Sequence, residues 1–252
     1  MNSSFNVVNS HLKFTKVSLV EPTSNFYLHI AAEIDHSMFP FFLTTSSAKK
    51  KLIDDAKQWC RELQKETSVL NAVVFKATLI PPGKGKFLTE QSDKVPTAKY
   101  DFVILIETKS LEKVEFIKST AEYKNIETSI HNISRHIHIT TATNIKQINP
   151  VDHQKNGVFL FNYFVADNLQ QNLAIWEYTA GWFQQETALD NSTVLQPIDQ
   201  ANSRYKIINH CRWNKMSDIL PSLLFKKSFH SYVLDNFYTN KIAAMPILYK
   251  LA

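Results

Sequence analysis

The chain has 252 residues, of which 44% are hydrophobic and 20% are charged, and its net charge is +5. This composition predicts a globular protein with a sizeable core and excludes general disorder. The positive charge is spread thinly. We interpret its one basic run, Lys49-Lys50-Lys51, as a solvated helix face, and we expect no nucleic-acid partner. The glycine cluster Gly83-Lys84-Gly85-Lys86 lacks the spacing of a phosphate-binding loop, so we interpret it as a flexible basic loop.

The cysteines and the N-terminus also exclude several classes of protein. Cys60 and Cys211 have no Cys-x-x-Cys partner, so the sequence predicts neither a disulfide framework nor a cysteine zinc site. The first nine residues lack the basic and apolar segments of a secretory signal. No stretch approaches the roughly 20 apolar residues of a membrane span. We therefore expect a cytoplasmic protein with no membrane partner.

The first half of the chain predicts the element order βαββαβ. Residues 1–24 form an N-terminal extension, in which Leu12–Val20 could add an edge strand. Apolar and β-branched runs predict the strands, and three-to-four-residue apolar spacing predicts the helices. The expected elements are a strand at Phe26–Ile34, a helix from Ser46 or Ser47 to Lys65, strands at Val69–Ile80 and Tyr100–Glu107, a helix at Leu111–Ile130, and a strand at Arg135–Ile145.

The second half repeats this order after a linker at residues 147–156. Asp167 or Asn168 can cap its first helix. Pro221 fits the first turn of its second helical region, which continues with spacing four through Phe225, Phe229, Val233 and Phe237. The expected elements are a strand at Val158–Val165, a helix ending near Asp190, strands at Val194–Pro197 and Arg204–Trp213, helix from Ser217, and a strand at Ala243–Leu251.

The βαββαβ order is that of the ferredoxin-like motif, a four-stranded sheet with both helices on one face. The other sheet face must be covered, and the strands here are apolar on both faces. The sequence therefore predicts an α+β protein of two tandem ferredoxin-like repeats, residues 25–146 and 157–252, that form a single-chain version of a dimeric α+β barrel. We expect a monomer, or a dimer through surfaces other than the sheet faces.

Residues 157–252 resemble one family of such barrels. Its pattern is carried by the helix end Gly181-Trp182-Phe183, the short strand Val194-Leu195-Gln196-Pro197, the strand from Tyr205 to Asn214, and a helix containing Ser228-Phe229. This half resembles the antibiotic-biosynthesis-monooxygenase type of dimeric α+β barrel, and residues 25–146 share only its topology. Stress-response, EthD-like and haem-degrading barrels have a similar outline and stay open as sister families.

The resemblance implies a site. In cofactor-free members of the family, an Asn and a Trp four residues apart hold a phenolic substrate inside the barrel for attack on oxygen. Asn209 and Trp213 have this spacing and share one strand face with Cys211. His210 is the best candidate for proton transfer, although it lies on the other face unless a β-bulge intervenes. His230 is an alternative and a candidate axial haem ligand.

Aromatic residues near this strand predict either a core or a pocket wall for a flat ligand. The candidate substrate-binding residues are Trp176, Trp182, Phe183 and Phe229. His136 and His138, with His131 nearby, could begin a metal site, but we interpret them as a polar strand face.

Three functions stay open. The first is a cofactor-independent monooxygenase-like enzyme acting on an aromatic or quinol-like molecule, without metal. The second is a noncatalytic barrel that binds a small apolar ligand or a protein partner. The third is a barrel with a filled interior and no ligand. A cavity beside Asn209 and Trp213 would separate the first two from the third.

Overall fold

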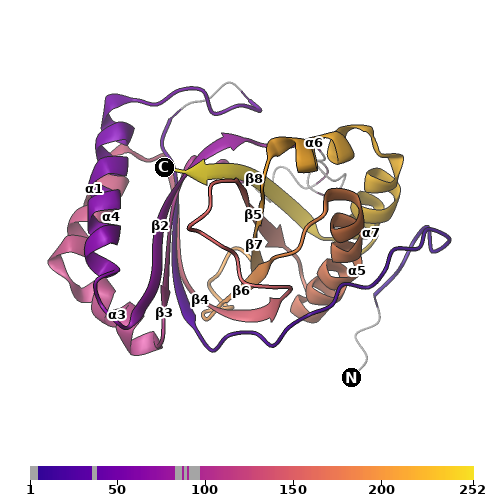
Figure 1. Cartoon of the computed structure of the whole chain (residues 1–252), viewed down its shortest axis with the longest axis horizontal. Coiled ribbons are helices and arrows are strands. Elements are labelled where there is room, and N and C mark those ends of the chain that lie inside the picture. Colours follow the sequence, from indigo (N-terminus) through magenta and orange to yellow (C-terminus); the bar gives the residue numbers. More distant parts are fainter. Residues whose placement is uncertain (1–4, 36–38, 83–86, 88–89, 91–96) are drawn as a thin grey trace.

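The computed structural model describes residues 5–35, 39–82, 87, 90 and 97–252, so the predicted loop at residues 83–86 lies outside the described residues. The described strands form a closed barrel of antiparallel neighbours in the order β1-β3-β2-β8-β5-β7-β6-β4 (Figure 1). The strands are β1 (Phe26–Glu33), β2 (Val69–Leu79), β3 (Phe102–Thr108), β4 (His136–Gln147), β5 (Val158–Val165), β6 (Thr193–Pro197), β7 (Ile207–Trp213) and β8 (Ala243–Leu251).

Each half of the chain contributes four neighbouring strands. The first half supplies β4-β1-β3-β2 and the second supplies β8-β5-β7-β6. The two half-sheets are joined edge to edge at two seams, where β2 pairs with β8 and β4 pairs with β6. This arrangement confirms the predicted single-chain α+β barrel. That the two halves superpose stays a prediction.

Helices cover the outer face of each half-sheet (Figure 1). The first group is α1 (Ser47–Leu63), α3 (Leu111–Ser119) and α4 (Ala121–Ile133), and the second is α5 (Leu169–Thr187), α6 (Met216–Phe225), the π-helix η1 (Phe229–Leu234) and α7 (Asp235–Thr239). None of the described helices is both long and apolar enough to cross a lipid bilayer.

Four local expectations were wrong. The run Lys49-Lys50-Lys51 is not wholly a solvated helix face, because Lys49 is buried. The helix expected at residues 111–130 is split at Thr120, whose extended backbone ends α3 and whose side chain caps α4. Pro221 lies in the middle of α6, because that helix begins at Met216. Residues 12–20 form no strand, and Val20 makes only a single bridge to Gln147.

The barrel interior is a packed core. Inward-facing side chains of both halves meet there, and the largest of them are aromatic: Tyr27, Phe75, Tyr100, Phe159, Phe161, Tyr163, Tyr205 and Tyr249. His210 also points inward and stacks on Phe161 with ring centroids 4.1 Å apart. Two further apolar layers lie between the barrel and the two groups of helices.

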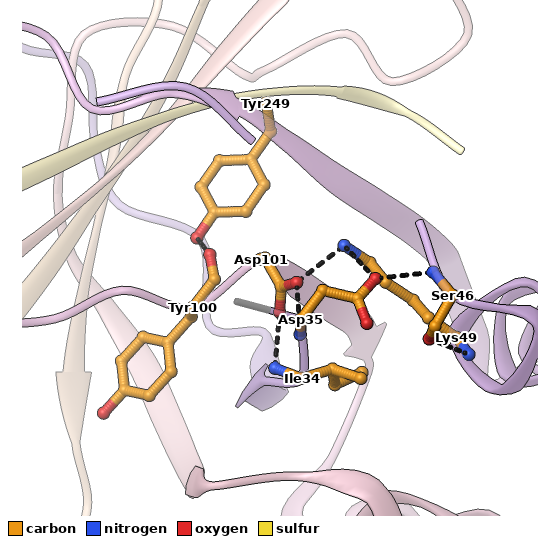
Figure 2. A network of polar contacts seen from close by, with 7 residues as sticks. All are labelled: Ile34, Asp35, Ser46, Lys49, Tyr100, Asp101 and Tyr249. Atoms are coloured by element: carbon orange, nitrogen blue, oxygen red, sulfur yellow. Dashed lines mark hydrogen bonds and ion pairs between the residues drawn. The ribbon is translucent and has the colours of Figure 1, made fainter. Parts of the chain in front are cut away.

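A buried ion pair fixes α1 to the barrel (Figure 2). Lys49 Nζ, in the first turn of α1, lies 2.7 Å from Asp101 Oδ2, and both side chains are buried. Asp101 also accepts hydrogen bonds from the backbone N–H groups of Ile34 (2.7 Å) and Asp35 (3.0 Å). Asp35 in turn accepts one from the backbone N–H of Ser46 at the N-cap. One carboxylate thus joins the end of β1, the start of β3 and the start of α1.

The N-terminal segment, residues 5–20, is here named the strap. It runs along α5, η1 and α7 (Figure 1). Asn240 holds the backbone of Asn6 on both sides, since its Oδ1 accepts from the Asn6 N–H and its Nδ2 donates to the Asn6 carbonyl. Asn236 holds Val8 in the same way. Two side chains one helical turn apart therefore bind an extended backbone.

We expect Gly181→Ala to loosen the strap and to lower the free energy of unfolding by about 1–3 kcal/mol, as overpacking does. A Cβ at residue 181 would lie 2.1 Å from the carbonyl oxygen of Thr15, so the backbone there must move. Urea unfolding and limited proteolysis of the strap measure the effect. Gln185→Ala is the control, because it removes two hydrogen bonds to Thr15 without a clash. Equal behaviour of the two variants would contradict the prediction.

Candidate functional site

A cavity lies between the outer face of β5 and β7 and the helix α5. Asn209, Cys211 and Trp213 point into it from β7, as the alternation of the strand requires. Trp176 and Phe183 line it from α5. We name this space the Asn209 cavity. The predicted pair therefore shares one cavity, but that cavity is in the helical layer, whereas the resemblance implied the barrel interior.

Two amides meet in this cavity. Asn162 of β5 is the direct cross-strand partner of Asn209 of β7. Asn209 Oδ1 accepts a hydrogen bond from Ser192 Oγ at 2.5 Å. Asn162 Oδ1 is buried and has no hydrogen-bond partner among the described residues. An unpaired buried acceptor is costly, so this oxygen is suited to a donor from a bound molecule.

Trp213 faces the cavity with its ring and not with its N–H group. The indole Nε1 donates to Thr187 Oγ1 at 3.0 Å, and the side chain is 3% exposed. The hydrogen bond fixes the plane of the ring against the cavity. The indole N–H therefore donates to Thr187 and not to a ligand in the cavity.

The cavity is small, and its wall is apolar apart from two amides and two hydroxyl groups. Its volume is about 30 Å³, the space of a single water-sized molecule. Phe183 is a partly exposed wall residue, so it lies where the cavity approaches the surface. The one titratable group in the wall is the Cys211 thiol, and burial raises its pKa well above the ordinary value. The site can therefore orient and desolvate a ligand, but its wall offers no base at neutral pH.

His210 lies on the opposite face of β7, inside the barrel. The β5–β7 ladder is regular, so no bulge turns its ring toward Asn209. Its Nδ1 lies 2.9 Å from the Leu160 carbonyl oxygen and its Nε2 lies 2.8 Å from His153 Nε2. Burial holds the pKa of His210 well below its ordinary value. A direct proton transfer from this ring to the Asn209 cavity has no path in this arrangement.

The remaining candidates lie outside the cavity wall. Trp182 donates its Nε1–H to Ser228 Oγ and packs on Phe229 with centroids 5.3 Å apart. His230 is exposed on η1. His136 is exposed, whereas His138 lies in the barrel against Tyr205, 4.8 Å between centroids. The described residues contain no cluster of three His, Cys, Asp or Glu suited to a metal ion.

Sequence reasoning missed Asn162, Ser192 and Thr179, which also line the cavity. Asn162 left a signal, because it is the single polar residue in the apolar run 158–165. Its pairing with Asn209, 47 positions later, depends on the register between β5 and β7, which the sequence pattern does not predict.

Comparison with known proteins shows the fold. No protein-family model and no curated protein matches this chain. A solved structure described as an anthrone oxidase-like protein superposes with a TM-score of 0.64 at 10% identity, covering 91% of this chain and 92% of that one. A protein of Fusobacterium nucleatum, provisionally described as a monooxygenase, gives a TM-score of 0.56 at 8% identity, covering 90% and 92%. A similarly described protein of Lactobacillus acidophilus gives 0.50 at 8% identity, covering 91% and 94%. This chain thus has the α+β barrel fold of these structures.

Proposed function

We propose that this protein is a monooxygenase-like enzyme that acts on an aromatic or quinol-like small molecule held in the Asn209 cavity. The observation that carries the proposal is the pair of facing amides, Asn162 and Asn209, in an apolar space with one unpaired buried oxygen. Such an oxygen would accept a hydrogen bond from a phenol O–H, while the Trp213 ring would stack on the aromatic system. The fold shared with anthrone oxidase-like and monooxygenase-like proteins agrees with this chemistry.

The reaction that suits this site draws its electrons from the substrate. In an anthrone-type molecule, the activated CH₂ group reacts with O₂, so that one oxygen atom becomes the new carbonyl and the other leaves as water with both hydrogens. The protein's part is to orient the ring and to exclude water. Asn209, Asn162 and Trp213 supply the orientation. We give His210 no role in it, because its ring faces the barrel interior, where it stacks on Phe161.

A ring-sized substrate requires the cavity to open, since about 30 Å³ holds no ring. Phe183 is a suitable gate, because it lines the cavity and is partly exposed. Rotation of this side chain toward solvent would join the cavity to the surface. The proposal therefore includes a movement of Phe183 on binding.

We expect Asn162→Ala to weaken binding of an anthrone or hydroquinone by roughly ten-fold or more, and to abolish oxygen uptake, because the ligand loses the unpaired buried oxygen that is its polar anchor. An oxygen electrode and a thermal-shift titration measure both effects. Asn125→Ala, on the exposed face of α4, is the matched control. If no compound of an anthrone, hydroquinone and flavonoid panel shifts the melting temperature of the parent protein, the proposal is wrong.

A second function is favoured by one observation: the described wall of the cavity contains no base at neutral pH. A noncatalytic barrel that binds a small apolar ligand needs no reaction with oxygen. Binding of a panel compound without oxygen consumption would support this second function over the first.

A further inference from the structure

A second pocket, of about 350 Å³, lies beneath the strap on another face of α5. It shares no lining residue with the Asn209 cavity. Its volume falls in the range of small-molecule sites. We name it the strap pocket; it is lined by Phe5, Phe14 and Lys16 of the strap and by Ala174, Glu177, Tyr178 and Tyr232.

Four aromatic rings form its walls. Tyr178 and Tyr232 are stacked with centroids 4.7 Å apart and an interplanar angle of 25°. Phe14 lies 4.5 Å from Tyr232 and Phe5 lies 6.0 Å from Tyr178, both tilted. Tyr232 is held in place by a hydrogen bond from its hydroxyl to the Tyr178 carbonyl oxygen. A pocket walled by fixed ring faces and edges suits a planar aromatic ligand.

The charges at and beside the pocket favour an anion; Lys16 and Glu177 line it, and Lys146 lies on the other side of Glu177. The Glu177 carboxylate lies between two ammonium groups, 2.6 Å from Lys16 Nζ and 2.5 Å from Lys146 Nζ. Two positive charges thus share one negative charge, which leaves a local excess of one positive charge. The Lys16 side chain is 77% exposed and lines the pocket, so its remaining N–H groups can reach a ligand.

The strap that closes the pocket is anchored. Asn240 and Asn236 hold the backbone of Asn6 and Val8 with hydrogen bonds of 2.7–3.2 Å. These bonds place Phe5, next to Asn6, at the wall of the pocket without help from a ligand. A preorganised wall reduces the entropy that a ligand must overcome on binding.

We propose that the strap pocket binds a planar aromatic carboxylate, with the ring against Phe14, Tyr178 and Tyr232 and the carboxylate at Lys16. This site is separate from the proposed oxygenase function and does not depend on it. It would take an aromatic acid as a ligand and not as a substrate, because its wall holds no group placed for a reaction.

The test is a calorimetric titration of the full chain with 2-naphthoate, compared with neutral 2-naphthylmethanol and cationic 2-naphthylmethylammonium. Naphthoate should bind most tightly. Lys16→Met should weaken the binding of naphthoate by roughly ten-fold, as expected for a lost charge-assisted hydrogen bond. The same variant should leave the affinity for naphthylmethanol unchanged. Because Lys16 is exposed, this variant keeps its fold.

Two further variants locate the binding. Phe14→Ala should weaken the binding of all three probes, whereas Asn209→Ala should leave their affinities unchanged. Tighter binding of the cation, loss of binding in Asn209→Ala, or no measurable binding of naphthoate would each overturn the proposal.

Discussion

Asp101→Ala is expected to lower the free energy of unfolding by about 3–5 kcal/mol, because it removes the nearer partner of the buried Lys49 ammonium and leaves it only the Asp35 carboxylate, 3.9 Å away. The same change removes the acceptor of two backbone N–H groups, those of Ile34 and Asp35 (Figure 2). Each unpaired buried donor adds to the cost. Urea unfolding followed by circular dichroism gives the difference directly.

The control for this prediction is Asp55→Ala. Asp55 pairs with Lys51 on the same helix, one turn apart, but both side chains are well exposed. Exposed pairs contribute about 0–1 kcal/mol, so this variant should unfold nearly as the parent does. A loss below about 1 kcal/mol for Asp101→Ala would show that Asp101 does not hold α1 to the barrel.

As the pH is lowered, this protein is expected to lose stability at a pH well above the range in which its carboxylates titrate. Burial lowers the pKa of His138 and His153 to about 4 and places those of His29 and His210 well below the ordinary value. In the unfolded chain these groups titrate near pH 6.5. Below that pH the unfolded state binds more protons than the folded state, so the free energy of unfolding falls as the pH falls.

The expected size is about 2 kcal/mol each for His138 and His153 between pH 7 and pH 5, from the linkage relation with a folded-state pKa of about 4. The lowered pKa values of His29 and His210 act in the same direction, and the total is a large part of the stability of an ordinary domain, about 5–15 kcal/mol. Urea unfolding at half-unit steps from pH 7 to pH 5 measures the slope.

His138→Phe should reduce this fall in the free energy of unfolding by the contribution of one histidine. Its Nε2 has no hydrogen-bond partner among the described residues, so a phenyl ring replaces the imidazole at little polar cost. Arg204, whose charge also lowers the pKa of His138, is unchanged in this variant. A stability that does not change between pH 7 and pH 5 would contradict the expectation.

Sequence patterns were sufficient for the strands and for the shared face of Asn209 and Trp213, because both depend on local alternation along one strand. They could not predict the depth of the cavity or its second amide, because both depend on how β5, β7 and α5 pack. The position of His153 was also missed. It lies in the segment that we expected to be a linker, where no periodicity marks a side chain that enters the barrel to meet His210.

The two seams of the barrel have a consequence for biosynthesis. β2 and β4 are edge strands of the first half-sheet, and their partners β8 and β6 belong to the second half. A ribosome releases the first half with both edges unpaired and with an apolar inner face uncovered. Such edges promote association between chains until they are paired. The nascent chain is therefore most vulnerable to aggregation from the synthesis of β4 until β8 has left the ribosome, and a chaperone would act in that interval.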